Sequence, residues 1–187
     1  MADKSLPFIL VTYPPNAEAN ALLDRRPEDL RAFYADGVAR SFASARYRAD
    51  ELLSVTVDDE RHELVRFGST SHGSICLDPG SGEVAELVGP ASKRFVANSS
   101  LRAFTAVVRQ VSQAFPFYSN GATDEEIEAA AEQTAEVIRR MDEEALVPED
   151  GYWSRFIDDM LLGDWATDDV LYALARLDQS ATDHHCH

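Results

Sequence analysis

The side chains best suited to catalysis lie in one short stretch bounded by glycine, Gly68–Ser74 (GSTSHGS). A hydrolase could use one of its serines, Ser69, Ser71 or Ser74, as the nucleophile. His72 would then be the base that activates the serine. However, the G-x-S-x-G elbow is absent, neighbouring residues of a strand point to opposite faces, and the stretch contains no acid to orient His72. We therefore interpret the stretch as a polar turn between two strands.

Two other groups of side chains could hold a metal ion. The chain ends in the run His184–His187 (HHCH), in which every residue can ligate a transition metal. Structural zinc sites separate their ligands by two or more residues, and a flexible terminus loses entropy when it closes around an ion, so this run predicts weak, adventitious binding. Asp78 and Glu83 flank a turn, but the twelve-residue pattern of a calcium loop is missing around them. We expect no functional metal site and no cofactor.

The cysteines do not indicate redox chemistry. The chain has 2 of them, which is too few for a disulfide framework. Cys76 lies between Ile75 and Leu77, so the alternation of a strand places it on the opposite face from both. We expect Cys76 to be a small, buried or half-buried packing residue.

The acidic residues are concentrated in the last third of the chain. The whole sequence has 33 acidic residues against 17 Lys and Arg, a formal net charge of -16, and residues 121–187 hold 18 of the acids and 4 of the bases. This charge repels phosphates, so it disfavours direct binding of nucleic acid, whereas it attracts a basic protein. The excess can mark an interaction surface, or it can be a solvated helical face that maintains solubility. Adjacent acids diverge by about 100° on a helix, so they form no acid–base dyad by themselves.

The centre of the chain must supply the strands that position these groups. Five short runs are rich in β-forming residues and are separated by Gly, Pro, Asp or Ser, at 52–57, 63–67, 74–77, 84–88 and 95–97. Their linkers are too brief for crossover helices, which predicts a mostly antiparallel sheet of about five strands. The turn Asp78–Gly82 (DPGSG) should fold the third run back onto the fourth.

Helical spacing replaces strand alternation after residue 98. Asn98–Ser100 offers N-cap side chains to a helix with a regular apolar stripe, which Phe115-Pro116 ends. Thr123 and Glu126 form a capping-box pattern at the start of a second helix. Further helices are predicted at 27–34, 153–161 and 170–177, and Leu161 belongs to the apolar stripe of the second of these. Residues 7–13 are predicted to form a strand or packed arm. We expect one α+β domain over residues 1–179, with its helical last third acidic, and a disordered tail at 180–187.

No segment predicts export or membrane insertion. The N-terminus lacks a basic n-region, and its apolar run at 6–11 is short and contains Pro7. No run reaches the apolar length that spans a bilayer. We expect a cytoplasmic protein that does not bind membranes.

An ordered set of short motifs lies within residues 63–111. They are an FG strand end, a strand reading ICLDP, a hairpin with GEV and a helix start reading NSSLRAF, at 67–68, 75–79, 82–84 and 98–104. In this order and spacing they resemble the core of the SUKH superfamily, and most closely its bacterial immunity-protein branch. Trp153 and the stretch Gly163–Trp165 (GDW) are also similar to that branch.

The resemblance implies a strongly bent central sheet flanked by helices, and a role as the antidote to a toxin used in bacterial conflict. Such toxins are commonly nucleases or deaminases encoded beside their antidote, which acts by tight binding and occlusion. The resemblance transfers no catalytic residue to this chain. Two alternatives stay open: a regulatory interaction module of the same fold, and an enzyme that uses His72 or the terminal His/Cys run.

A toxin that holds nucleic acid has a basic rim, which an acidic antidote would complement. Aromatic residues beside acids make good interface anchors, which singles out Trp165 between Asp164 and Asp168–Asp169. The other possibility is that Trp165 anchors the core of the last helices. The predicted partner-binding residues are Asp158, Asp159, Asp164, Trp165, Asp168 and Asp169. The oligomeric state is not predicted.

Overall fold

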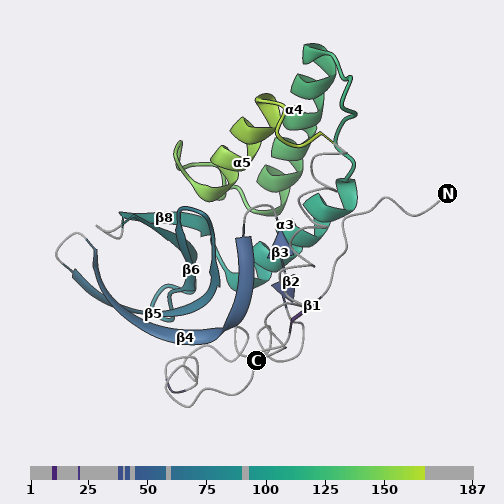
Figure 1. Ribbon diagram of the computed structural model, residues 1–187. Coiled ribbons are helices and arrows are strands. Elements are labelled where there is room, and N and C mark those ends of the chain that lie inside the picture. The colour runs from purple at the N-terminus through teal and green to yellow at the C-terminus, as the bar shows by residue number, and fades with distance from the viewer. Residues whose placement is uncertain are drawn as a thin grey trace, which may run out of the picture.

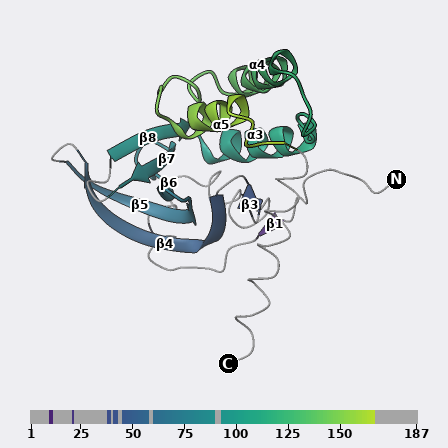
Figure 2. The ribbon, with the colours of Figure 1, turned by 45° about the horizontal axis from the view of Figure 1, so that its top comes forward.

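The computed structural model describes residues 61–89 and 93–166 in full. Of the remaining residues it describes only the secondary structure at 10–11, 21, 38–39, 41–42, 45–57 and 60. A curved antiparallel sheet and a layer of helices packed against it make up this part of the chain (Figure 1). The view in Figure 2 shows the helical layer on one side and the long strands on the other.

The structure describes eight strands, of which β3 to β8 follow one another in sequence order across the main sheet. They are β1 Leu10–Val11, β2 Val38–Ala39, β3 Ser41–Phe42, β4 Ala45–Val57, β5 Glu60–Ser69, β6 Gly73–Leu77, β7 Val84–Val88 and β8 Lys93–Asn98. β1 pairs with β2 alone, while β3 to β8 form one sheet in which every neighbouring pair is antiparallel. The predicted α+β class and antiparallel pairing are confirmed. The main sheet has six strands instead of about five, because the short β3 adds to the edge of β4.

The bend of the sheet coincides with irregularities in its pairing. The register shifts between Tyr47 and Glu51 on β4, between Arg66 and Gly68 on β5, and at the start of β7. An extra residue on one strand bends that strand and increases its twist. β4 and β5 accordingly arch around one side of the sheet (Figure 1).

Local capping signals begin two of the three described helices. α3 spans Leu101–Ala114, and its N-cap Ser100 accepts the N–H of Ala103 at 3.1 Å. α4 spans Asp124–Met141 and has the predicted capping box, in which Thr123 and Glu126 each accept a backbone N–H of the other. α5 spans Tyr152–Leu161 and begins after Gly151 without a side-chain cap. The predicted end of α3 before Pro116 is also confirmed, since proline cannot continue the hydrogen-bond ladder.

The helices pack on one face of the sheet. This core contains apolar side chains of β5, β6 and β7 together with those of all three helices, among them Phe67, Ile75, Leu77, Phe104 and Trp153. Leu64, Cys76 and Leu87 are buried on the opposite face. Cys76 therefore points away from both Ile75 and Leu77, as strand alternation predicts.

The prediction that the run Asn98–Ser100 caps α3 is confirmed: Ser100 has the capping role, while Asn98 ends β8 and is fully buried. The predicted place of Leu161 in the apolar stripe of α5 is wrong. Leu161 is 47% exposed, because it follows the buried Met160 by one residue and points about 100° away from the buried face of α5.

Several predictions fall on residues outside the described part of the chain. They concern the helices at 27–34 and 170–177, the tail at 180–187 and the terminal run His184–His187. Of the predicted segment at 7–13, only β1 is described.

Candidate functional site

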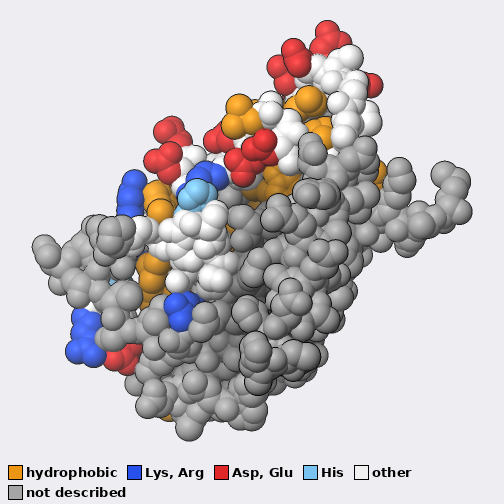
Figure 3. Space-filling view, in the orientation of Figure 1, with side chains coloured by type: hydrophobic (Ala, Val, Ile, Leu, Met, Phe, Trp, Pro, Cys, Tyr) orange, Lys and Arg blue, Asp and Glu red, His pale blue; other side chains and the backbone are white. Residues whose placement is uncertain are grey.

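α5 and the turn after it present predicted partner-binding acids to solvent. Asp158 and Asp159 are exposed near the end of α5, and Asp164 is exposed in the turn that follows. Asp168 and Asp169 lie outside the described residues. Acidic side chains gather over α4 and α5 on the face shown in Figure 3.

Two exposed leucines lie among these acids. Leu161 is 47% exposed and Leu162 is 77% exposed, directly between Asp159 and Asp164 in the chain. An apolar pair with an acidic rim has the composition of a protein-binding surface, in which apolar residues supply contact area and charges supply selectivity. Below, the α5 surface means Asp158, Asp159, Leu161, Leu162 and Asp164.

Trp165 lies beneath the α5 surface. Trp165 is only 9% exposed. Its ring centroid lies 4.7 Å from that of Phe156 and 6.0 Å from that of Phe117. The hydroxyl of Tyr118 donates to the carbonyl of Met160 at 2.8 Å and accepts the N–H of Trp165 at 3.0 Å. This position is that of a core anchor, which fixes the turn carrying Asp164 against α5.

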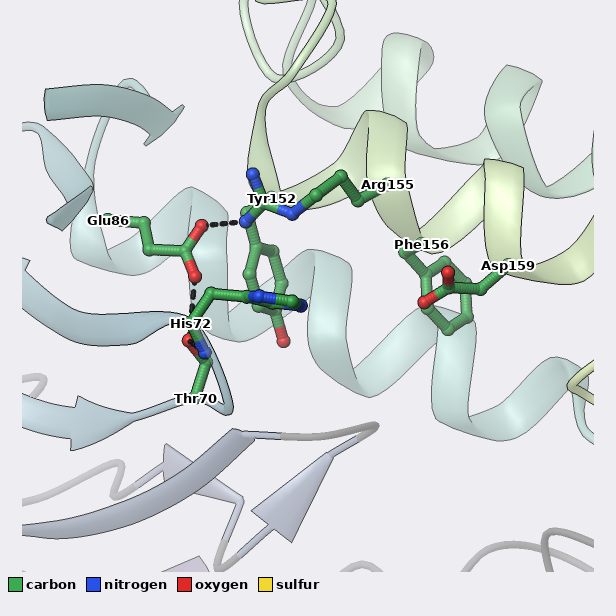
Figure 4. Close-up of a pocket in the computed structure, with 7 residues that line it drawn as sticks. All are labelled: Thr70, His72, Glu86, Tyr152, Arg155, Phe156 and Asp159. Carbon is green, nitrogen blue, oxygen red and sulfur yellow. Dashed lines mark hydrogen bonds and ion pairs between the residues drawn. The ribbon is translucent and has the colours of Figure 1, made fainter. Parts of the chain in front are cut away.

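A small pocket lies between α5 and the sheet (Figure 4). Its volume is about 50 Å³, and its lining residues are Thr70, His72, Glu86, Tyr152, Arg155, Phe156 and Asp159. Enzyme and cofactor sites generally need several hundred Å³. The pocket has room for the head group of a single side chain.

The floor of the pocket contains a buried ion pair. Glu86 on β7 is fully buried, and it faces the helices because it lies opposite Ile75 in the register of β6 and β7. Its carboxylate accepts the hydroxyl of Thr70 at 2.7 Å and the guanidinium of Arg155 on α5. A buried carboxylate needs such partners because desolvation otherwise disfavours its charge. The pair therefore ties α5 to the centre of the sheet.

Asp159 and His72 lie at the mouth of the same pocket (Figure 4). Burial raises the pKa of the Asp159 carboxyl, and the neighbouring negative charges of Asp164 and Asp158 raise it further. The charges of His72 and Arg155 oppose that shift only in part. The fold thus gathers negative charge around Asp159.

The arrangement does not assemble the hydrolase machinery considered from sequence. Ser69, Ser71 and Ser74 are not among the residues that line the pocket with His72. The aliphatic hydroxyl among the lining residues is that of Thr70, which donates to Glu86 and accepts the backbone N–H groups of His72 and Gly73. That hydroxyl shapes the turn between β5 and β6.

Side-chain hydrogen bonds hold the turn between β6 and β7. Asp78 accepts the backbone N–H of Gly80 at 2.7 Å, and Arg94 on β8 donates to both Asp78 and Glu83. The guanidinium of Arg94 thus occupies the position between the two carboxylates. Gly82, at φ 88°, closes the turn in a conformation that favours glycine.

Within residues 61–89 and 93–166, no three His, Cys, Asp or Glu side chains come together as metal ligands would. None of the helices in the described part combines the length and apolarity needed to cross a bilayer.

Sequence reasoning missed the Glu86–Arg155 pair and the exposure of Leu162. A signal for the pair was present, because Glu86 interrupts the apolar strand Val84–Val88. A lone acid in a buried strand requires a cationic partner. The sequence does not show which cation this partner is, because Arg155 lies 69 residues further along the chain.

The comparisons agree with the motifs of the sheet and of α3. The sequence model of the SUKH-4 immunity protein family matches residues 17–159, which is most of the chain and extends well beyond the motifs at 63–111. Searches of curated proteins and of solved structures gave no match. The extent of the family match shows that this chain belongs to the SUKH-4 immunity protein family.

Proposed function

We propose that this protein is an immunity protein that binds a cognate bacterial toxin and neutralises it by occlusion, without catalysis. The observation that carries the proposal is the family match over residues 17–159. The proposal includes a cytoplasmic site of action and a toxin of basic character, with a nuclease or a deaminase as the first candidates. Such toxins hold nucleic acid, and basic residues supply most of that affinity.

The α5 surface is the proposed contact. It combines three exposed carboxylates with Leu161 and Leu162, and the buried Trp165 supports it from below. The carboxylates would steer a basic partner to this face, and the leucines would become buried in the complex. Asp168 and Asp169 follow closely in sequence and belong to the same proposal.

Co-expression with the toxin gene encoded beside this protein tests the function. Cells should survive when both proteins are made, and a stoichiometric complex should elute from a size-exclusion column. Cell death despite soluble, folded protein, together with no complex on the column, would refute the proposal.

Charge-matched variants test the interface. Replacing Asp158, Asp159 and Asp164 by Asn should lower the association rate at low salt by about tenfold, because steering depends on local charge. The control replaces Glu125, Glu128 and Glu132 on α4 by Gln, which removes the same net charge elsewhere. If both triple variants slow association equally, the acids act only through net charge and the α5 surface is not the contact.

A further inference from the structure

We propose that the pocket between β7 and α5 receives one basic side chain of the toxin, an arginine in preference to a lysine, beside Asp159. This inference rests on the proposed function, since it names the chemistry of the partner at the same surface. Asp159 is shared by the pocket and the α5 surface, so the two features form one continuous site.

The size of the pocket limits what can enter it. About 50 Å³ suits a planar head group and excludes a nucleotide, a cofactor or a folded loop. Exposed Leu162 follows the pocket-lining Asp159 by three residues, so the two lie about one helical turn apart on the same side of α5. A partner that covers Leu162 would therefore be within reach of the pocket.

The charges of the pocket favour a cation. Among the described residues that line it, Arg155 is the one Lys or Arg, and its guanidinium already donates to Glu86 and to the carbonyl of Asp150. The charge of Arg155 is therefore balanced by a fully buried carboxylate, which leaves Asp159, His72 and Tyr152 as the other titratable side chains of the lining. The carboxylates of Asp158 and Asp164 act on Asp159 from nearby and add negative charge there. An entering anion would meet Glu86, Asp159 and the nearby Asp164, whereas a cation would offset the repulsion among them.

The walls of the pocket favour arginine. Tyr152 and Phe156 place aromatic rings along it (Figure 4), and guanidinium groups pack on aromatic rings more readily than the strongly hydrated ammonium of lysine does. The planar group can also donate two hydrogen bonds to one carboxylate. Arginine is among the residues that most often dominate binding at interfaces.

The first experiment needs no toxin. The full chain, labelled with ¹⁵N, is titrated with N-acetyl-arginine amide, with the neutral N-acetyl-citrulline amide and with N-acetyl-aspartate amide. We expect saturable shifts at the amides of His72, Phe156 and Asp159 with the arginine compound alone, at concentrations on the order of 10 mM. Asp159→Asn should abolish the shifts, and Asp158→Asn should preserve them.

The inference is overturned if the arginine compound gives no saturable shift, if the citrulline compound gives an equal one, or if Asp159→Asn leaves the shifts unchanged. A response to the aspartate compound would identify an anion pocket and would also overturn it. Asp159 is exposed, and near-UV circular dichroism verifies that each variant is folded.

The second experiment separates this inference from the proposed function. In the toxin complex, Asp159→Asn should raise the dissociation rate about tenfold, whereas Asp158→Asn should mainly lower the association rate. If wild-type protein binds the toxin and both variants dissociate at the same rate, the pocket inference fails while the proposed function stands. If wild-type protein binds no toxin, the proposed function fails, whatever the arginine titration gives.

Discussion

Trp153 on α5 donates its indole N–H to the side-chain oxygen of Asn98, at the end of β8, over 2.8 Å. The amide of Asn98 in turn donates to Asp142, the C-cap residue that follows α4, also at 2.8 Å. All three side chains are buried. The side-chain amide of Asn98 thus joins β8 to both α4 and α5, and it keeps α5 in position against the sheet.

Removing the centre of this network should be costly. Asn98→Ala leaves a buried indole N–H and a buried carboxylate without that partner, so we expect a loss of about 2–4 kcal/mol of unfolding free energy. Urea denaturation followed by tryptophan fluorescence measures it. Gln113→Ala, an exposed position on α3, should change the same quantity by no more than about 0.5 kcal/mol. Equal effects of the two substitutions would contradict the structural role of Asn98.

The ion pair of the pocket should matter more than a surface pair. Arg155→Met leaves Glu86 buried without its cation and should cost about 2–3 kcal/mol of stability, since Glu86 is 0% and Arg155 27% exposed. Arg139→Met removes the matched exposed pair with Glu136 and should cost about 0.5 kcal/mol or less. Chemical denaturation of both variants tests the difference. A cost for Arg155→Met no greater than that of its control would show that solvent compensates Glu86.

Gly73 should tolerate no side chain. A Cβ built on this residue would lie 1.7 Å from the carbonyl oxygen of Leu87, the residue before Val88, which pairs with Gly73 across β6 and β7. Gly73→Ala must therefore separate the two strands, and we expect more than about 3 kcal/mol of destabilisation or no folded protein. Gly121→Ala, where nothing lies within 4 Å of the new Cβ, is the control. Similar melting temperatures for the two variants would refute the close approach.

The thiol of Cys76 should be inert in the folded protein. Burial raises its pKa to about 12, and the positive charge of Arg66 counteracts only part of that shift. In a Cys186→Ser variant, Cys76 is the single thiol. At pH 8 it should react with a disulfide reagent about 100-fold more slowly in the native protein than in denaturant, because only the thiolate reacts and access requires opening. Equal rates would show that the second face of the sheet is open.

Asp159 should reduce stability at neutral pH. Its folded pKa is raised, so its ionised form is less favourable in the folded state than in the unfolded chain. The sign follows from linkage: the unfavourable contribution is present above the folded pKa and disappears as pH falls below the unfolded value. Asp159→Asn should therefore be more stable than wild type at pH 7, and the difference should shrink as the pH falls through the folded pKa and vanish below the unfolded value. A stability difference that grows on acidification would reverse this assignment.

The sequence by itself determined the features that depend on near neighbours. The capping box of Thr123 and Glu126, the turn at Asp78–Gly82 and the opposite orientations of Cys76 and Ile75 all follow from spacings of five residues or fewer. Short-range hydrogen bonds and the alternation of strands fix them wherever the segment lies in the fold. The order of the motifs at 63–111 likewise indicated the family from the sequence alone.

Only the tertiary structure decided which distant side chains meet. Glu86 and Arg155 are 69 residues apart, and Asn98 and Trp153 are 55 apart. Their contacts depend on how far the sheet bends and on the angle at which α5 crosses it, which no local pattern encodes. The same packing buries Trp165, exposes Leu162 and brings His72 to the pocket that Asp159 lines. The sequence therefore indicated an acidic binding protein, whereas the packing of α5 on the sheet decided which side chains of α5 face solvent and which are buried.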